Sequence, residues 1–243
     1  GWVNPNPLVG TVVVRDGEIL AAGYHDRYRG PHAERMAFDY ADEHGVDMHG
    51  ATVIDTLEPC CHVGSQPACT DLILSHGITR VVVGSIDPNP IVAGKGLCIL
   101  EENGVEVVYD VMRAECDAIN RHFFHYITTG KPYIVDGRRR AGESDSEYAV
   151  RRRELYATYA AVLAGTESDV PDESFAHFNG PVQAVGADEV VIGGHRPLLL
   201  EAGALACTDP DEWLRELGKR KIDGLIVESD EAFERLSMAC QKD

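Results

Sequence analysis

The chain has 243 residues and a formal net charge of −18 at pH 7, with 44% hydrophobic and 26% charged residues. This composition indicates a globular protein with enough chain for one large or two modest domains. The negative charge argues against a nucleic acid substrate, because phosphate backbones are bound through clusters of Lys and Arg, and no apolar run is long enough to span a bilayer.

The first elements predicted along the chain are two strands, residues 8–14 and 19–24, which the turn signal Asp16-Gly17 joins into a hairpin. Asn4 and Asn6 precede prolines ahead of the first strand. Asn-Pro pairs commonly make turns, and the alternative is that these residues present an amide to the edge of a heterocycle. Since the hairpin begins so early, we expect that a helix preceding it is missing.

A helix is predicted to begin at Pro31, which suits a first helical turn, and to end at Gly45. Apolar residues recur between them at helical spacing. His32 and Glu34 therefore lie at a helix N-terminus. The helix dipole disfavours positive charge there and is expected to keep His32 neutral, as a metal ligand must be.

Two cysteines complete a candidate metal site with this histidine. Cys60 follows a strand predicted for residues 51–56, and Cys69 follows in a second Pro-containing run. Three protein ligands are typical of catalytic zinc, which leaves the fourth position to water. Glu34 can carry the proton of that water. His-x-Glu followed by Pro-Cys and a further Cys is the signature of zinc deaminases that act on amino-pyrimidine or purine rings.

Chance occurrence and a structural zinc are the two alternatives to this interpretation. Each short motif alone is weak, and only their order and their position after strand-like runs make the combination specific. In a structural site, Cys61 or His62 would supply a fourth ligand. Glu34 argues against that reading, because a structural site needs no carboxylate beside the metal.

Strands and helices alternate through the rest of the first half, which implies a sheet covered by helices. The predicted elements are a helix over 70–76, a strand over 80–85, a loop over 87–90, a helix over 94–102, a strand over 105–108 and a helix over 114–126. The seven cysteines show no spacing of a disulfide framework, and two are assigned to zinc, so the cytoplasm is the expected compartment.

Five longer motifs occur in order: N-P-N-P-L-V-G (4–10), P-H-A-E (31–34), T-L-E-P-C-C-H-V-G (56–64), P-A-C-T-D (67–71) and D-P-N-P-I-V-A-G-K-G (87–96). With them, about half of the chain closely resembles the deaminase half of the bifunctional riboflavin-biosynthesis deaminase/reductase family. The eight residues between Cys60 and Cys69 and the 87–96 run are specific to that family among zinc deaminases.

The resemblance implies a reaction and roles for the residues of the site. The reaction is removal of an amino group from 2,5-diamino-6-ribosylamino-4(3H)-pyrimidinone 5′-phosphate, which gives the 5-amino uracil derivative and ammonia. By this likeness His32, Cys60 and Cys69 hold Zn²⁺. Glu34 takes a proton from the attacking water, whose pKa the metal lowers, and then protonates the departing amine.

The same likeness implies further residues that contact the substrate or line its pocket: Asn6, His25, His62, Asp87 and Asn89. A structural alternative exists for each. His25 has the alternative of a hydrogen-bonded histidine at the end of a strand. Asp87 and Asn89 have the alternative of capping a turn.

The chain departs from the family pattern at Ser65, where the family usually has a Lys or Arg that meets the substrate phosphate. A hydroxyl is a weaker phosphate partner than a cation. We expect Arg27, Arg29 or Lys95 to supply the charge. The alternative is that the substrate is another free amino-heterocycle without a phosphate.

The second half resembles the family's reductase domain at residues 131–137 and 213–228, but its length of about 110 residues is roughly half of what a dihydrofolate-reductase-like domain needs. The family has Gly-Gly after Glu228, where this chain has Ser229-Asp230, and a carboxylate is a poor neighbour for the phosphates of NADPH. A turn at 163–166 and Gly193-Gly194 are weak candidates for phosphate loops.

Two basic islands, residues 138–140 and 151–153, are expected to be solvated charge, with an anion site as the alternative. We expect the second half to serve packing or dimerisation. A bifunctional protein with NADPH-dependent 5-amino-6-(5-phosphoribosylamino)uracil reductase activity is the alternative.

The sequence therefore predicts an α/β protein: a cytidine-deaminase-like three-layer α/β/α domain over residues 1–128, followed by a shortened, reductase-derived α/β domain over residues 129–243. The expected cofactor is Zn²⁺, with NADPH as the alternative addition. The expected partner is a small-molecule pyrimidine, with no nucleic acid or membrane, and the chain is expected to form a homo-oligomer. A non-catalytic dimeric scaffold is the competing class, against which Glu34 argues.

Overall fold

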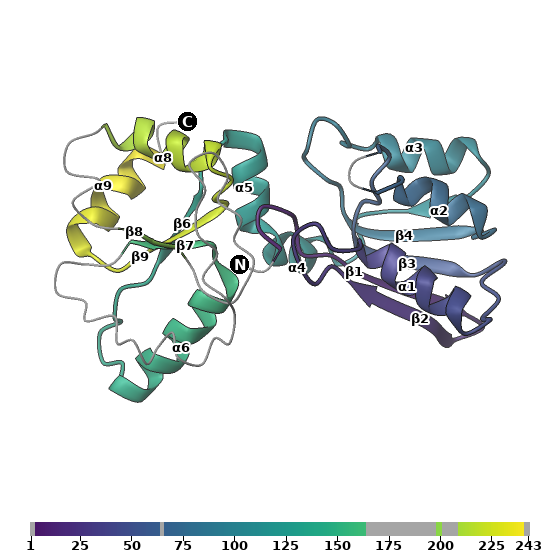
Figure 1. Ribbon diagram of the computed structural model, residues 1–243, viewed down its shortest axis with the longest axis horizontal. Coiled ribbons are helices and arrows are strands. Elements are labelled where there is room, and N and C mark those ends of the chain that lie inside the picture. Colours follow the sequence, from purple (N-terminus) through teal and green to yellow (C-terminus); the bar gives the residue numbers. More distant parts are fainter. Residues whose placement is uncertain (1–2, 64–65, 164–197, 201–208, 241–243) are drawn as a thin grey trace. The chain divides into compact units, whose positions relative to one another are not determined.

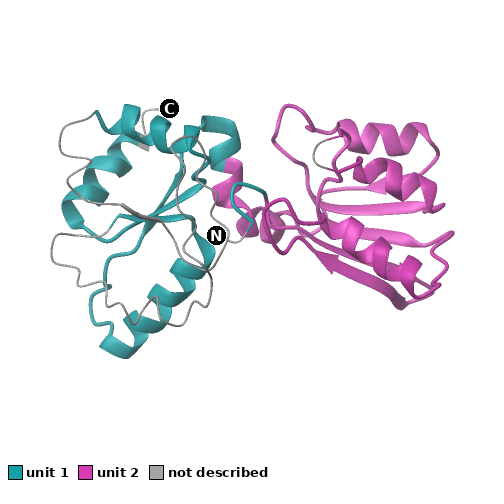
Figure 2. Cartoon of the chain, in the orientation of Figure 1, with its two compact units in different colours: residues 1–6, 125–243 teal, residues 7–124 magenta. Residues whose placement is uncertain are grey.

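The computed structural model describes residues 3–63, 66–163, 198–200 and 209–240 (Figure 1). The chain divides into two compact units, which Figure 2 distinguishes by colour. One comprises residues 7–124, and the other comprises residues 125–243 together with residues 1–6. No helix among the described residues is long and apolar enough to cross a membrane.

The 7–124 unit is built on a five-stranded sheet in the order β2-β1-β3-β4-β5. Its strands are β1 (Gly10–Arg15), β2 (Glu18–Tyr24), β3 (Thr52–Leu57), β4 (Arg80–Ser85) and β5 (Glu106–Val108). Its helices are α1 (Ala33–Glu43), α2 (Cys69–Ser75), α3 (Lys95–Glu102) and α4 (Arg113–Ile119). β1 pairs antiparallel with β2 and β3, whereas β3, β4 and β5 run parallel and are joined through α2 and α3.

The predicted hairpin is confirmed, and its turn explains the Asp-Gly pair. Asp16 and Gly17 have φ values of 54° and 81°, as in a type I′ turn. This turn matches the right-handed twist of the two strands that it joins. The register of β1 on β2, and through β1 on β3, is thus set close to the start of the unit.

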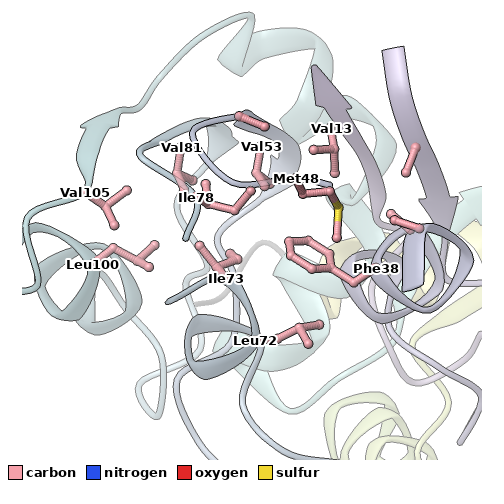
Figure 3. Packing of buried hydrophobic residues seen from close by; sticks show 14 of the residues in the cluster. Val13, Phe38, Met48, Val53, Leu72, Ile73, Ile78, Val81, Leu100 and Val105 are labelled. Carbon is pink, nitrogen blue, oxygen red and sulfur yellow. The ribbon is translucent and has the colours of Figure 1, made fainter. Parts of the chain in front are cut away.

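The core of this unit lies between one face of the sheet and three helices (Figure 3). Because side chains alternate along a strand, every second strand residue faces the helices and is buried. Buried members of the cluster from strands and from α1, α2 and α3 are Val13, Val53, Val81, Phe38, Ile73 and Leu100. The opposite face carries α4, where a Cβ at Gly84 would lie 2.3 Å from the sulfur of Cys116. The expected α/β/α layering is therefore confirmed.

One predicted helix, over residues 114–126, is wrong. The structure has α4 and a separate α5 (Arg121–Thr129), with Asn120 between them. The fully buried side chain of Asn120 accepts a hydrogen bond from the N–H of Leu8 and donates one to the carbonyl of Leu8, both at 2.8 Å. Asn120 thus leaves the helical pattern in order to hold the chain where it enters β1.

In the second unit, four parallel strands among the described residues form a sheet in the order β6-β9-β7-β8. The strands are β6 (Tyr133–Asp136), β7 (Ala161–Leu163), β8 (Leu198–Leu200) and β9 (Gly224–Val227), and the helices besides α5 are α6 (Asp145–Thr158), α8 (Pro210–Lys219) and α9 (Asp230–Cys240). Leu163, Leu214 and Leu225 are fully buried in its core. Residues 164–166 and Gly193-Gly194, the candidate phosphate loops, lie outside the described residues.

Residues 1–6 group with this second unit through Asn4. Its side chain is buried, donates a hydrogen bond to the carbonyl of Lys221 at 2.7 Å and accepts one from the N–H of Asp223 at 3.0 Å. The amide of Asn4 is therefore bonded to the backbone that leads into β9. This contact is a structural one, so the amide of Asn4 does not present itself to a heterocycle.

Charged side chains fill the edge of the second sheet where its parallel strands end. Glu228 follows β9, and its side chain is 2% exposed. Arg152 of α6 donates two hydrogen bonds to its carboxylate, at 2.7 and 2.8 Å, and the hydroxyl of Tyr156 donates a third at 2.7 Å. The expectation of solvated charge for residues 151–153 is thus wrong for Arg152, which is 8% exposed and ion-paired.

A second ion-pair cluster stands at the same edge. Arg138 contacts Asp136, the last residue of β6, at 2.9 Å and Asp230, the first residue of α9, at 3.0 Å. Its guanidinium also lies 4.1 Å from the ring centroid of Phe233. The arginines at this edge are therefore occupied by carboxylates of the same unit.

Candidate metal centre

Three side chains with metal-binding atoms converge at the carboxyl end of β3. His32 is the N-cap of α1, Cys60 follows β3, and Cys69 is the first residue of α2. One ligand atom from each lies within 4.8 Å of the other two. Nδ1 of His32 is 3.5 Å from the sulfur of Cys60 and 3.3 Å from that of Cys69.

These distances fit a zinc ion. Tetrahedral zinc with bonds of about 2.1 Å to nitrogen and 2.3 Å to sulfur holds those atoms about 3.6 Å apart. The His32 nitrogen stands within a few tenths of an ångström of that separation from each sulfur. Cys61 and His62 are not members of the cluster, which is the sole candidate metal group among the described residues. The donor set is therefore the three-ligand type that leaves one coordination position open.

Close backbone packing brings the helix that carries His32 to this position. A Cβ at Gly23 of β2 would lie 2.2 Å from the carbonyl oxygen of Ala33 and 2.7 Å from the N–H nitrogen of Ala37. Only glycine permits the first turn of α1 to approach the strand so closely. The Gly-Tyr-His run at 23–25 is thus needed for the placement of His32.

The two sulfurs form a coupled pair. The hydrogen bond from Cys69 lowers the pKa of Cys60 to about 4, and the same interaction raises the pKa of Cys69. The lowered pKa of Cys60 favours the thiolate form that binds metals. The hydrogen bond with Cys60 also raises the pKa of His32, a shift opposite in direction to the one expected from the helix dipole.

Glu34 lies in the first turn of α1 and is 3% exposed. Burial raises the pKa of its carboxyl, while a hydrogen bond with Cys69 and the neighbouring His32 act in the opposite direction. A carboxyl whose pKa moves from its usual range toward neutrality suits a group that both takes and gives a proton. The structure thus places Glu34 in contact with the cluster.

Asp55 is a second buried carboxyl near the centre that sequence reasoning missed. It lies on β3 directly opposite Thr11 of β1, and the Thr11 hydroxyl donates to its Oδ1. Its Oδ2 is buried without a hydrogen-bond partner. Burial first, and then the charge of Glu34, raise the pKa of Asp55 well above its usual value. The signal in the sequence was an acidic residue that interrupts the buried face formed by Val53 and Leu57.

Replacing Asp55 by Asn is expected to stabilise the protein, and by more as the pH rises. The raised folded-state pKa means that the folded protein keeps this proton above pH 3.8, where an unfolded chain releases it, so stability is lost as the pH rises toward the folded pKa. Asn cannot ionise and escapes this loss. Denaturant unfolding with excess zinc at about pH 5 and about pH 8 measures the difference.

Asp16→Asn, at an exposed turn position, is the matched control and should show no pH-dependent gain. A stability gain for Asp55→Asn that is equal at both pH values would contradict a protonated Asp55.

His25 stands beside the cluster. It is 6% exposed, its Nδ1 is 2.8 Å from the carbonyl oxygen of Pro31, and its ring meets that of His32 edge to face at 5.7 Å between centroids. Burial lowers its pKa, so the imidazole is neutral at physiological pH. The hydrogen bond to Pro31 is the structural alternative foreseen for this residue, and the contact with His32 places it at the site.

Asp87 and Asn89 form two consecutive turns after β4. Oδ1 of Asp87 accepts the N–H of Asn89 at 2.8 Å, and Oδ1 of Asn89 accepts the N–H of Ile91 at 3.2 Å. Asp87 is 7% exposed, burial raises its pKa to about 6, and the nearby exposed His62 lowers it. Asp87 and His62 are thus neighbours, whereas Asn6 belongs to the segment that groups with the second unit and donates its N–H to Val3 at 2.7 Å.

The candidate phosphate cations have other contacts. Arg27 pairs with Asp26 at 2.7 Å, and Nζ of Lys95 donates to the carbonyls of Pro90 and Ile91 at 2.8 and 3.2 Å. Ser65 lies outside the described residues.

Gln66, beside Ser65, has a role that the sequence did not reveal. It donates to the carbonyl of Gly30 at 2.8 Å and accepts from the N–H of His32 at 3.5 Å. The segment between the two cysteines is thereby tied to the start of α1.

Comparison of the sequence with known proteins also finds similarity to zinc-binding deaminases. The family model of the cytidine and deoxycytidylate deaminase zinc-binding region matches residues 2–85. The riboflavin biosynthesis protein RibD of Actinobacillus pleuropneumoniae is 43% identical over 194 residues, which are 74% of this chain and 51% of that protein. RibD of Escherichia coli K12 is 42% identical over 183 residues, 70% of this chain and 49% of that protein. The chain spans about half the length of these curated relatives.

Solved structures extend the likeness to the second unit. A diaminohydroxyphosphoribosylaminopyrimidine deaminase/5-amino-6-(5-phosphoribosylamino)uracil reductase from Thermotoga maritima matches with a TM-score of 0.76 and 30% identity, over 98% of this chain and 78% of that one. Acinetobacter baumannii RibD matches with a TM-score of 0.63 and 26% identity, over 92% and 74% of the two chains. The expected α/β fold class is confirmed by these likenesses.

Proposed function

This chain belongs to the riboflavin-biosynthesis deaminase/reductase (RibD) family, and from that premise we propose that its 7–124 unit is a zinc-dependent deaminase of 2,5-diamino-6-ribosylamino-4(3H)-pyrimidinone 5′-phosphate. The observation that carries the proposal is the buried carboxyl of Glu34 in contact with a three-ligand His–Cys–Cys cluster. A structural zinc site has no use for such a carboxyl, which also argues against a non-catalytic scaffold.

In the proposed reaction, His32, Cys60 and Cys69 would hold Zn²⁺, which would lower the pKa of the attacking water. Glu34 accepts a proton from that water as the oxygen adds to the ring carbon that bears the amine. Glu34 then delivers the proton to the amine, so the carbon–nitrogen bond breaks and ammonia leaves. The neutral imidazole of His25 and the carboxyl of Asp87 are proposed to orient the ring, together with His62 and Asn89, and the substrate contact implied for Asn6 stays a prediction from the family resemblance.

The contacts of the candidate cations bear on which residue meets the substrate phosphate. Lys95 is disfavoured because its ammonium group already binds two backbone carbonyls. Arg27 is a proposed phosphate partner although it is paired with Asp26, because its side chain is 68% exposed and a guanidinium has five N–H donors. Arg29 is the second proposed partner. The competing substrate, an amino-heterocycle without a phosphate, needs neither arginine.

We propose that the second unit is a shortened reductase-derived domain that serves packing. In open parallel sheets, ligands bind beyond the carboxyl ends of the strands. Here that edge holds Asp136, Glu228 and Asp230, and its arginines Arg138 and Arg152 are paired with these carboxylates. The described residues at this edge do not fit the phosphates of NADPH.

The thiol ligands of the first unit also favour a reducing compartment such as the cytoplasm.

The test is ammonia release by the zinc-loaded full chain from the phosphoribosyl diaminopyrimidinone, with and without NADPH. We expect equal ammonia release in both cases and no loss of NADPH absorbance. Consumption of NADPH would show a bifunctional protein. Absence of ammonia from zinc-loaded protein would contradict the proposed substrate and point to another amino-heterocycle.

A further inference from the structure

Glu58 binds the backbone of a distant loop through its carboxylate. It follows β3, two residues before Cys60, and is 4% exposed. Its Oε2 accepts the N–H of Asp87 at 3.2 Å and that of Gly94 at 2.9 Å, and its Oε1 accepts the N–H of Gly96 at 3.0 Å. Three backbone donors thus converge on one buried carboxylate, which is not a member of the metal cluster.

The segment that Glu58 binds, residues 87–96, is named here the 87–96 loop. Its two ends are the residues that donate to Glu58, and its outer turn is held by Lys95, which donates to the carbonyls of Pro90 and Ile91. Three N–H groups of the loop thus donate to the buried carboxylate of Glu58, and two of its carbonyl groups accept from the exposed ammonium group of Lys95. Hydrogen bonds that involve an ionised group are about twice as strong as neutral ones, so both ends of this arrangement resist displacement.

Close packing adds to the fixed position of the 87–96 loop. A Cβ at Gly96 would lie 2.4 Å from the carbonyl oxygen of Pro59 and 3.2 Å from Oε1 of Glu58. Gly94 has a φ of 83°, in the left-handed region that glycine adopts without strain. The two glycines allow the loop to approach the backbone that carries Cys60.

We propose that Glu58 is a positioning residue, which fixes the 87–96 loop and so places the carboxyl of Asp87 beside the metal centre for recognition of the amino-substituted ring. The proposal rests on the proposed deaminase function for its catalytic consequence, but its structural part stands on the three hydrogen bonds alone. Because Glu58 and the candidate metal ligand Cys60 both follow β3 directly, one short segment carries the residue that holds the loop and a residue that would hold the metal.

The charge of Glu58 is essential to this role. Gln has the same shape but only one acceptor oxygen for three donors, and its NH₂ group would face a backbone N–H. Glu58→Gln should therefore release at least one of the three amides. Glu58→Asp keeps the charge but shortens the reach, and it serves as a second variant if Glu58→Gln does not fold. Glu101→Gln, at an exposed position of α3, is the matched control.

The experiment measures amide hydrogen exchange by NMR on zinc-loaded wild type and variants, with zinc content and steady-state kinetics on the same samples. In Glu58→Gln the amides of Asp87, Gly94 and Gly96 are expected to exchange faster, at wild-type zinc content. A misplacement of about 1 Å in a group that positions the substrate can cost about 100-fold in activity, and we expect the loss from a displaced Asp87 chiefly in KM. Glu101→Gln should match wild type throughout.

Unchanged exchange of all three amides in both Glu58 variants would overturn the proposal, whatever the substrate. Loss of zinc with the amides still protected would also overturn it, because Glu58 would then act on the metal site. Faster exchange with no measurable ammonia from any variant or from wild type would support the positioning role while contradicting the proposed substrate. The failure of the two proposals is thus distinguishable.

Discussion

Replacing Glu34 by Gln is expected to lower kcat for ammonia release by about 10²- to 10⁴-fold, the usual contribution of a general acid–base group, with zinc content unchanged. Gln fills the same buried space in the first turn of α1 but can neither take the proton of the attacking water nor return it to the leaving amine. The metal ligands are not altered by this substitution. Steady-state assays of ammonia release, with zinc measured on the same protein, give the result.

Glu43→Gln, at the exposed last residue of α1, is the matched control and should keep kcat within about twofold of wild type, as surface changes usually do. It changes the same net charge on the same helix, away from the cluster. Turnover by Glu34→Gln at the wild-type rate would contradict the role of proton carrier and leave the metal centre without an acid–base group among the residues assigned here.

The candidate metal ligands and Glu34 could be proposed from the sequence because their residue types occur in short local motifs. His32 and Glu34 lie within one helical turn, and the strand that ends before Cys60 has a clear apolar pattern. They converge because the fold brings the N-termini of α1 and α2 to the carboxyl end of β3. Local motifs and the order of strands and helices were therefore enough to propose most of the candidate site.

What the sequence did not reveal depends on contacts between distant residues. Asn120 lies between two helices and hydrogen-bonds to Leu8, a contact that no local pattern indicates. In the sequence Glu58 is only the neighbour of a Pro-Cys motif, and its bond to the 87–96 loop is visible only in the folded chain. Asp55 shares its strand face with the apolar residues Val53 and Leu57, and only the folded structure shows that it is buried opposite Thr11. Polar groups of this kind contribute no periodicity, so their partners cannot be assigned before the chain is folded.

The second unit shows the same limit in its charges. The run of arginines at 151–153 predicts a solvated helix face, since charged side chains are rarely buried. Arg152 is buried because Glu228, at the end of β9, offers both carboxylate oxygens to its guanidinium. Removing one partner of such a pair leaves an uncompensated buried charge, which destabilises the folded protein. Arg152 and Glu228 are therefore buried only as a pair. The result is a sheet edge that binds its own side chains.

Removing zinc is expected to abolish ammonia release and to lower the melting temperature of the 7–124 unit by about 10–20 °C. At a free zinc concentration of about 1,000 times Kd, the metal stabilises the folded state by about 4 kcal/mol, and each kcal/mol shifts the melting temperature of a unit of this size by several degrees. The second unit should be unaffected, because it holds none of the ligands.

The chain offers separate probes for the two units. Of the two tryptophans, Trp213 lies on α8 of the second unit, so in a Trp2→Phe background tryptophan fluorescence follows that unit. Amide exchange in β3 and β4 follows the first unit. After zinc is removed by a chelator, we expect the amides of β3 and β4 to exchange at a lower temperature. The melting transition followed by tryptophan fluorescence should not change. A lower melting temperature by tryptophan fluorescence, with unchanged amide exchange in β3 and β4, would contradict the prediction, because zinc would then stabilise the second unit.

A single ligand substitution tests the same centre without a chelator. Cys69→Ser replaces a soft thiolate by a hydroxyl, which binds zinc poorly, whereas Cys98→Ser changes an exposed thiol on α3 and should leave zinc and activity intact. Zinc should restore chelated wild type, while Mg²⁺ should not, because hard cations prefer oxygen ligands. Full activity of zinc-free protein, or of Cys69→Ser, would mean that the His32–Cys60–Cys69 cluster is not the reactive centre. The buried carboxyl of Glu34 would then have no water to act on.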